Sequence, residues 1–144
     1  MNWLFSLLAL LSGLALGVQA AINGGLGKRL GALEGAFVSF AVGTIALLVL
    51  VLSFGKGNIG TFTQVPKWQL TGGLLGAFYV AVSVMVVPRI GVATTLTAII
   101  LGQLCMGAVI DHFALFGGRH IPFDGKRLMG LVLLGGALYL FYKK

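Results

Sequence analysis

A small number of polar residues stand inside long apolar runs of this sequence, where a polar side chain is costly and therefore a candidate for function. The candidates are Gln19, Asn23, Tyr79, Gln103 and Asp111. Amide and phenol groups can bind a polar ligand through hydrogen bonds, and a carboxylate can take up a proton or pair with a cation. These residue types therefore favour reversible binding of a small polar or weakly cationic molecule.

Gln19 and Asn23 lie four residues apart near the end of the first apolar run, and a helix would place both on one face. Gly24, Gly25 and Gly27 follow at once, so we expect the helix to end or unwind there. Exposed backbone at such a break can line a cavity and contact a ligand. A glycine-rich loop in which Asn23 only caps the helix fits the same residues.

A second set of residues follows an i, i+4 spacing in the fourth run, and its members are Thr95, Gln103, Gly107 and Asp111, with Ile99 between Thr95 and Gln103. The spacing predicts that the amide of Gln103 and the carboxylate of Asp111 lie along one line of a helix, with Gly107, which has no side chain, between them. Gln103 can bind a ligand or bridge to another helix. Asp111 is a candidate proton or cation site, and a position at the membrane interface is the alternative. Tyr79 and Ser83, four residues apart, could add hydroxyl groups to the same cavity.

The composition is that of an integral membrane protein. The chain has 144 residues, of which 58% are hydrophobic and 9% charged, and its mean hydropathy is +1.05. These values exclude a disordered chain, a disulfide scaffold and an ordinary soluble enzyme. The net charge of +7 comes from cations that flank the apolar runs, which is typical of membrane-facing ends and not of a nucleic-acid surface.

Charged residues divide the chain into five apolar runs, which predict an all-α integral membrane protein with five membrane-spanning helices in one domain, residues 1–144. The expected helices are 3–23, 34–54, 68–88, 92–116 and 126–142. A bilayer core of about 30 Å needs about 20 helical residues. The first run is expected to be a spanning helix and not a signal peptide, because no lysine or arginine precedes it. The last run is the shortest, so its flanking cations would have to reach the membrane surface along their side chains.

The distribution of lysine and arginine predicts the orientation of the chain in the membrane. With five crossings, one side holds Lys56, Lys67, Arg119, Lys126 and Arg127, and the other holds Lys28, Arg29, Arg89, Lys143 and Lys144. Five cations against five give no bias, so we expect insertion in both orientations and an antiparallel pair. If the fifth run did not cross, the count would become seven against three and one orientation would follow.

Small residues recur every four positions in three of the expected helices. The stripes are Gly13 and Gly17, then Gly31, Gly35, Ser39 and Gly43, and then Gly72 and Gly76. Such stripes let helix backbones approach closely in lipid. They predict either packing inside one bundle or a surface between subunits that slides during a conformational change.

Motifs of enzymes are absent from the sequence. It contains no phosphate-binding loop, no constellation of histidine and acidic residues for a metal, and no serine nucleophile with a paired base. The single cysteine, Cys105, excludes a disulfide within one chain. We therefore expect no enzymatic activity, no cofactor and no metal.

Several segments together resemble the YdcZ-type inner-membrane exporters of the drug/metabolite transporter superfamily. They are Gln19-x-x-x-Asn23-Gly24-x-Leu26-Gly27, Gly35-Ala36-Phe37-x-Ser39-Phe40-x-x-Gly43-Thr44, Pro66-x-Trp68, Gly72-Gly73-x-x-Gly76-Ala77-x-Tyr79, Gly102-Gln103-Leu104 and Asp111-x-Phe113-x-Leu115-x-Gly117. The resemblance covers essentially the whole chain and implies a five-helix unit in a bacterial inner membrane that pairs antiparallel. The small multidrug resistance relatives rely on a glutamate in their first helix, whereas this chain has Gln19 and Asn23 there, so their proton coupling is not carried over.

These observations predict a small secondary transporter, an exporter of a small polar or weakly cationic metabolite. It would work by alternating access as an antiparallel homodimer, a ten-helix inverted repeat within the lipid bilayer. Gln19, Asn23, Tyr79 and Gln103 would line the substrate cavity, with Asp111 as the proton or cation site, and no nucleic acid would be bound. The alternative is a non-transporting membrane subunit that packs against a larger membrane partner through its glycine stripes.

Overall fold

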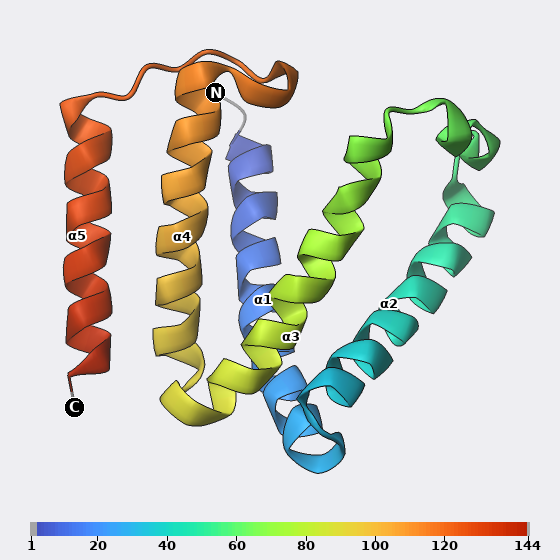
Figure 1. The fold of residues 1–144 in the computed structure, drawn as a ribbon, viewed down its shortest axis with the longest axis horizontal. Coiled ribbons are helices and arrows are strands. Elements are labelled where there is room, and N and C mark those ends of the chain that lie inside the picture. Colours follow the sequence, from blue (N-terminus) through green and yellow to red (C-terminus); the bar gives the residue numbers. More distant parts are fainter. Residues whose placement is uncertain (1–2, 144) are drawn as a thin grey trace. The chain divides into compact units, whose positions relative to one another are not determined.

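The structure, a computed structural model, describes residues 3–143, and these residues form helices and connecting segments without a β-strand (Figure 1). The α-helices are α1 (Trp3–Leu30), α2 (Ala32–Phe54), α3 (Gly72–Ile90), α4 (Val92–Phe113) and α5 (Gly125–Tyr142). Three short 3₁₀ helices lie in the connections, namely η1 (Ile59–Gln64), η2 (Lys67–Thr71) and η3 (Leu115–Gly117). The prediction of an all-helical protein is confirmed.

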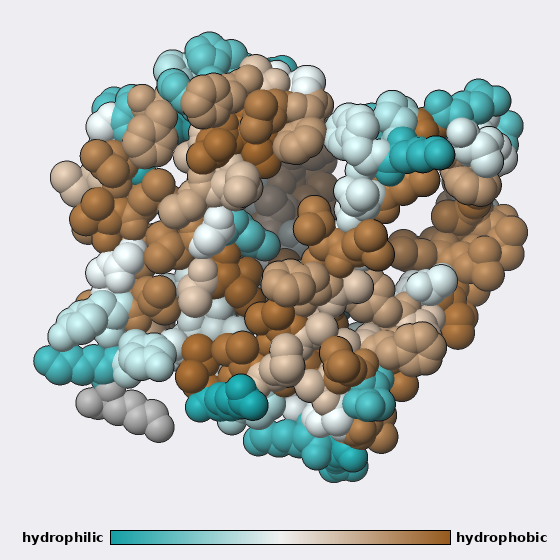
Figure 2. Space-filling model, in the orientation of Figure 1, coloured by the Kyte–Doolittle hydropathy of each residue, from teal (hydrophilic) through white to brown (hydrophobic). Residues whose placement is uncertain are grey.

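Four segments of the described chain are long and apolar enough to cross a membrane: Trp3–Leu30, Ala32–Phe54, Lys67–Ile90 and Val92–Phe113. Hydrophobic side chains cover most of the helix surfaces, and hydrophilic ones gather at the helix ends (Figure 2). This is the pattern expected of helices surrounded by lipid. The α5 helix is not among the four segments, and two of its 18 residues, Lys126 and Arg127, are charged.

The chain folds into two compact units, Met1–Arg89 and Ile90–Lys144. The first unit contains α1, α2 and α3, and the buried cluster at its centre consists of Ala36, Val80 and Val84. The second unit contains α4 and α5, which lie side by side (Figure 1).

The first helix does not end at the glycines that follow Asn23, so both expectations for this segment, an unwound helix and a capping loop, are wrong. The α1 helix continues through these glycines to Leu30. A Cβ atom at Gly24 would stand 2.8 Å from Cγ1 of Val87, and one at Gly27 would collide with Cγ1 of Val84. The absence of a side chain at these glycines therefore allows α1 to pack closely against α3. The chain reverses at Gly31 instead, whose φ of 105° is costly for any other residue.

The predicted glycine stripes contribute unequally to packing inside the first unit. A Cβ atom at Gly35 of α2 would stand 3.1 Å from Cα of Gly27, so these two backbones are in close contact. By contrast, a Cβ atom at Gly13, Gly43 or Gly72 would meet nothing within 4 Å. The close packing therefore uses one residue of the predicted stripe on α2, together with glycines that the sequence had marked as a helix break.

The second unit is an antiparallel helical hairpin that is fastened at both ends. At one end, Oγ1 of Thr94 at the start of α4 donates a hydrogen bond to the carbonyl of Phe141 near the end of α5, at 3.2 Å. At the other end, Asp111 near the end of α4 forms an ion pair with Arg127 near the start of α5. The two helices therefore run alongside one another over the whole of α5.

The fourth helix ends at Phe113 and not at residue 116 as predicted, because the backbone turns into the left-handed region at Ala114, with a φ of 49°. The connection to α5 is held by a hydrogen bond from the backbone N–H of Ile121 to the carbonyl of Asp111, at 2.9 Å. Asp124 then caps α5, because its side chain accepts a hydrogen bond from the backbone N–H of Arg127 at 2.9 Å.

Candidate functional site

The most unusual polar residue of the first unit is Asn23, whose side chain is buried with only 5% of its surface exposed. It makes no side-chain hydrogen bond to any other residue in the described chain, 3–143. No polar side-chain atom in that range is both fully enclosed and unpaired. The amide of Asn23 therefore keeps a narrow opening, through which the polar group of a ligand could supply the missing hydrogen bonds.

Gln19 does not join Asn23 in this buried position, because its side chain is exposed. Four residues of an α-helix rotate by about 400°, so the second residue is displaced by about 40° around the helix axis. The face that is buried contains Ala20, Asn23 and Gly24. The two amides that were predicted to share one face thus have different surroundings.

Tyr79 and Ser83 also differ from each other in their surroundings. Ser83 is buried, but its hydroxyl donates a hydrogen bond to the carbonyl of Tyr79 at 2.8 Å, so its donor is used within its own helix. Tyr79 is half-buried and packs against the cluster of Ala36, Val80 and Val84. The tyrosine side chain belongs to the packing of the first unit in this conformation.

The predicted polar stripe on α4 does not stay on one side of the helix. Thr95 is buried and its hydroxyl donates a hydrogen bond to the carbonyl of Gly91 at 2.6 Å, whereas Gln103 is exposed and Asp111 is half-exposed. Each i, i+4 step adds about 40° of rotation, so Thr95 and Asp111 stand about 160° apart around the axis. The stripe prediction is therefore wrong for the full length of α4.

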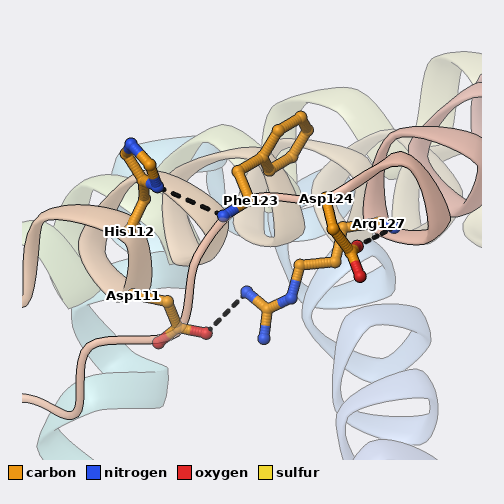
Figure 3. Close-up of polar contacts among 5 residues, drawn as sticks. All are labelled: Asp111, His112, Phe123, Asp124 and Arg127. Carbon is orange, nitrogen blue, oxygen red and sulfur yellow. Dashed lines mark hydrogen bonds and ion pairs between the residues drawn. The ribbon is translucent and has the colours of Figure 1, made fainter.

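Asp111 is paired with a cation from its own chain, which the sequence did not predict. Its Oδ2 lies 3.0 Å from a terminal guanidinium nitrogen of Arg127, and the two side chains are 39% and 33% exposed (Figure 3). The sequence alone places Arg127 among the cations that flank the apolar runs. The signal that could have found the pair is topological, because a helical hairpin brings the end of α4 and the start of α5 to the same place.

The ion pair closes one end of a groove of about 420 Å³ between α4 and α5. The groove is lined by small and aliphatic residues as well as the two charges: Leu104, Gly107, Ala108, Asp111, Arg127, Gly130, Leu131 and Leu134. Gln103 is not among its lining residues, although its neighbour Leu104 is. The groove offers an apolar surface with one charged end, which suits a small ligand that has a polar or charged group.

Long apolar helices, one of which buries an amide, define a multi-pass membrane protein that can offer polar contacts to a solute. Comparison with known proteins identifies the family: residues 4–140 match the family model described as "Putative inner membrane exporter, YdcZ", and the chain belongs to this family. The predicted family membership and inner-membrane location are thereby confirmed.

A relative supports this assignment over part of its length. The chain is 32% identical over 96 residues to the inner membrane protein YdcZ of Escherichia coli strain K12. The match covers 65% of this chain and 64% of the Escherichia coli protein, so it spans just under two thirds of that relative. No solved structure matches the chain.

Proposed function

We propose that this protein is a small secondary transporter that exports a small polar or weakly cationic metabolite by alternating access. Two five-crossing chains would pair antiparallel and form the transport pathway together. The observation that carries the proposal is Asn23, a buried amide on a membrane-spanning helix of an exporter-family chain, which has no hydrogen-bond partner among residues 3–143. Such a group is costly unless a ligand or water completes its hydrogen bonds.

The hairpin of the second unit supports the fifth crossing. If α4 spans the membrane, α5 must follow it back, because the Asp111–Arg127 and Thr94–Phe141 contacts fasten the two helices at opposite ends. The 18 residues of α5 have a length of about 27 Å, close to the thickness of the bilayer core. Five crossings leave equal numbers of lysine and arginine on the two sides, which favours insertion in both orientations.

The exposed amide side chains of Gln19 and Gln103 support the pairing of this chain with a second copy. Gln19 and Gln103 both lie on spanning helices and both are exposed in the single chain. An amide that faces lipid leaves its donors and acceptors unsatisfied, at a cost of several kcal/mol per group. A second copy that encloses a hydrated cavity would cover both side chains and would give them a role in lining the substrate pathway together with Asn23 and Tyr79.

The ion pair narrows the role proposed for Asp111. Its carboxylate already accepts a hydrogen bond from Arg127, so a cationic substrate at this site would have to displace the guanidinium. We therefore assign Asp111 to the charged end of the groove between α4 and α5, where a substrate competes with Arg127 for the carboxylate.

Replacing Gln103 with leucine is expected to abolish transport while the protein stays folded and dimeric, because an exposed side chain supplies no packing inside the chain. The test is uptake of isotopically labelled small amines, amino acids and polyols into liposomes that contain only the purified protein. The matched control is Gln64→Leu, which changes an exposed amide in η1, outside the spanning segments, and should leave uptake unchanged. Normal uptake by Gln103→Leu would remove Gln103 from the pathway.

The same liposomes test the class of protein. Uptake of a member of the panel by the wild-type protein supports a self-sufficient transporter. Absence of uptake for every compound, together with stable co-purification of another membrane protein, would overturn the proposal in favour of an interaction subunit.

A further inference from the structure

We propose that His112 is a proton-binding site that controls the junction between α4 and α5. The junction consists of the Asp111–Arg127 ion pair and the hydrogen bonds that Ile121 and Phe123 make to the end of α4, and we call these three contacts the latch. Figure 3 shows the ion pair and the contact of Phe123. A neutral His112 keeps the latch closed, and a protonated His112 releases it.

The direction of one hydrogen bond supports this role of His112. The backbone N–H of Phe123 donates to Nδ1 of His112 at 3.1 Å (Figure 3). A ring nitrogen accepts a hydrogen bond only when it carries no proton, so this contact requires a neutral imidazole with its proton on Nε2. The contact therefore depends on the protonation state of the His112 ring.

The contact is linked through the chain to the ion pair. Phe123 immediately precedes Asp124, which caps α5 by accepting a hydrogen bond from the backbone N–H of Arg127. The guanidinium of the same arginine reaches Asp111, the residue next to His112. Losing the bond at Phe123 therefore loosens the segment that holds the start of α5 against the end of α4.

Protonation also changes the charges at the junction. The titratable groups nearest to His112 are His120, whose ring centroid lies 6.1 Å from that of His112, and Cys105, which lines the same groove as His112. Asp111 and Arg127 line the other groove, and Asp124 follows Phe123 in the chain. A proton on Nδ1 would bring two N–H donors face to face at Phe123. The hydrogen bond at Phe123 is therefore present while Nδ1 carries no proton and is lost when Nδ1 takes one up.

The latch closes two grooves at once. The groove of about 420 Å³ ends at Asp111 and Arg127, and a second groove of about 440 Å³ is lined by His112 and Phe123. The two grooves share Ala108 and Leu131, which separate them. Release of the latch would therefore part the α4–α5 hairpin at one end and open both grooves there.

One consequence rests on the proposed function. In an antiparallel pair, the two copies of His112 lie at opposite faces of the membrane and meet the pH of different compartments. A proton gradient would then release the latch on the acidic side and keep it closed on the other side. This gives alternating access a direction, with the proton as the coupling ion.

The experiment is solution NMR on the full-length protein in detergent micelles, with the imidazole nitrogens of His112 and the amide of Phe123 observed from pH 8 to pH 5. We expect the unprotonated Nδ1 signal at pH 8. As His112 titrates, the hydrogen-exchange protection of the Phe123 amide should fall about tenfold, with the same midpoint, after correction for the intrinsic pH dependence. His120→Gln should leave this behaviour in place.

Two variants of His112 sharpen the test. His112→Asn supplies an amide oxygen near the position of Nδ1 that accepts a hydrogen bond but does not titrate, so its Phe123 amide should stay protected down to pH 5. His112→Phe removes the acceptor and should show low protection at every pH. Constant protection in the wild type while His112 titrates, or an equal loss in His112→Asn, would overturn the proposal. Since no transport is measured, failure of the latch and failure of the proposed function are separate results.

Discussion

Replacing Gly27 with alanine is expected to destabilise the first unit by about 1–3 kcal/mol, the usual cost of forcing an extra group into a packed site. The new Cβ atom would collide with Cγ1 of Val84, the most deeply buried side chain of the unit, with 2% of its surface exposed. A valine in a helix has one strongly preferred rotamer, so Val84 cannot turn away without cost. The neighbouring backbone of Gly35 limits any retreat of α1.

The measurement is the free energy of unfolding of the purified protein in mixed micelles. Gly13→Ala is the matched control, because its Cβ atom would meet nothing within 4 Å, and alanine is the better helix former by about 1 kcal/mol. The Gly13→Ala variant should therefore not lower the free energy of unfolding. The double variant Gly27→Ala with Val84→Ala should recover part of the loss, since the smaller side chain makes room. Equal stabilities for Gly27→Ala and Gly13→Ala would show that α1 and α3 do not pack as described.

Replacing Asn23 with leucine is expected to reduce transport to the background of empty liposomes without lowering stability. Asn23 is buried and has no hydrogen-bond partner within residues 3–143, so the folded chain gains no internal bond from its amide. Leucine has a similar size and needs no hydrogen bond, so it can fill the same position without leaving a polar group unsatisfied. Loss of flux with equal or higher stability is the signature of a residue kept for ligand binding.

Ser83→Ala is the control for this variant. Ser83 is also buried in the first unit, but its hydroxyl is bonded to the carbonyl of Tyr79, so it is not free to bind a substrate. Flux should persist in Ser83→Ala, and unfolding free energies of all three proteins should be measured in the same micelles. Full flux in Asn23→Leu would exclude Asn23 from the substrate pathway. A clear loss of stability would instead give Asn23 a structural role.

The helices could be predicted because charges interrupt the apolar runs, and a run of apolar residues bounded by charges has few alternatives to a helix. Their ends were harder to predict. Gly24 and Gly27 carry the same local signal whether they break a helix or let a neighbour approach, and the contacts with Val87 and Val84 that decide between these roles come from another helix. The left-handed turn at Ala114 likewise has no local signal, because alanine is an ordinary helix former.

The individual residues of the candidate site could be predicted from the sequence, but their arrangement in space could not. Asn23 was found because a polar residue in an apolar run is conspicuous. Its separation from Gln19 follows from helix rotation and burial, which depend on the neighbouring helices. The partner of Asp111 was missed because Arg127 is 16 residues away and lies in a different helix. Only the hairpin brings the two charges together.

The location of the C-terminus distinguishes an antiparallel pair of five-crossing chains from chains that share one orientation. Two reporters, one active only in the cytoplasm and one active only outside it, are fused in turn after Lys144 and expressed in a bacterial cell. Because five crossings place five lysine and arginine residues on each side, we predict comparable activity from both fusions. Activity from one fusion alone would mean a single orientation and would contradict the antiparallel homodimer.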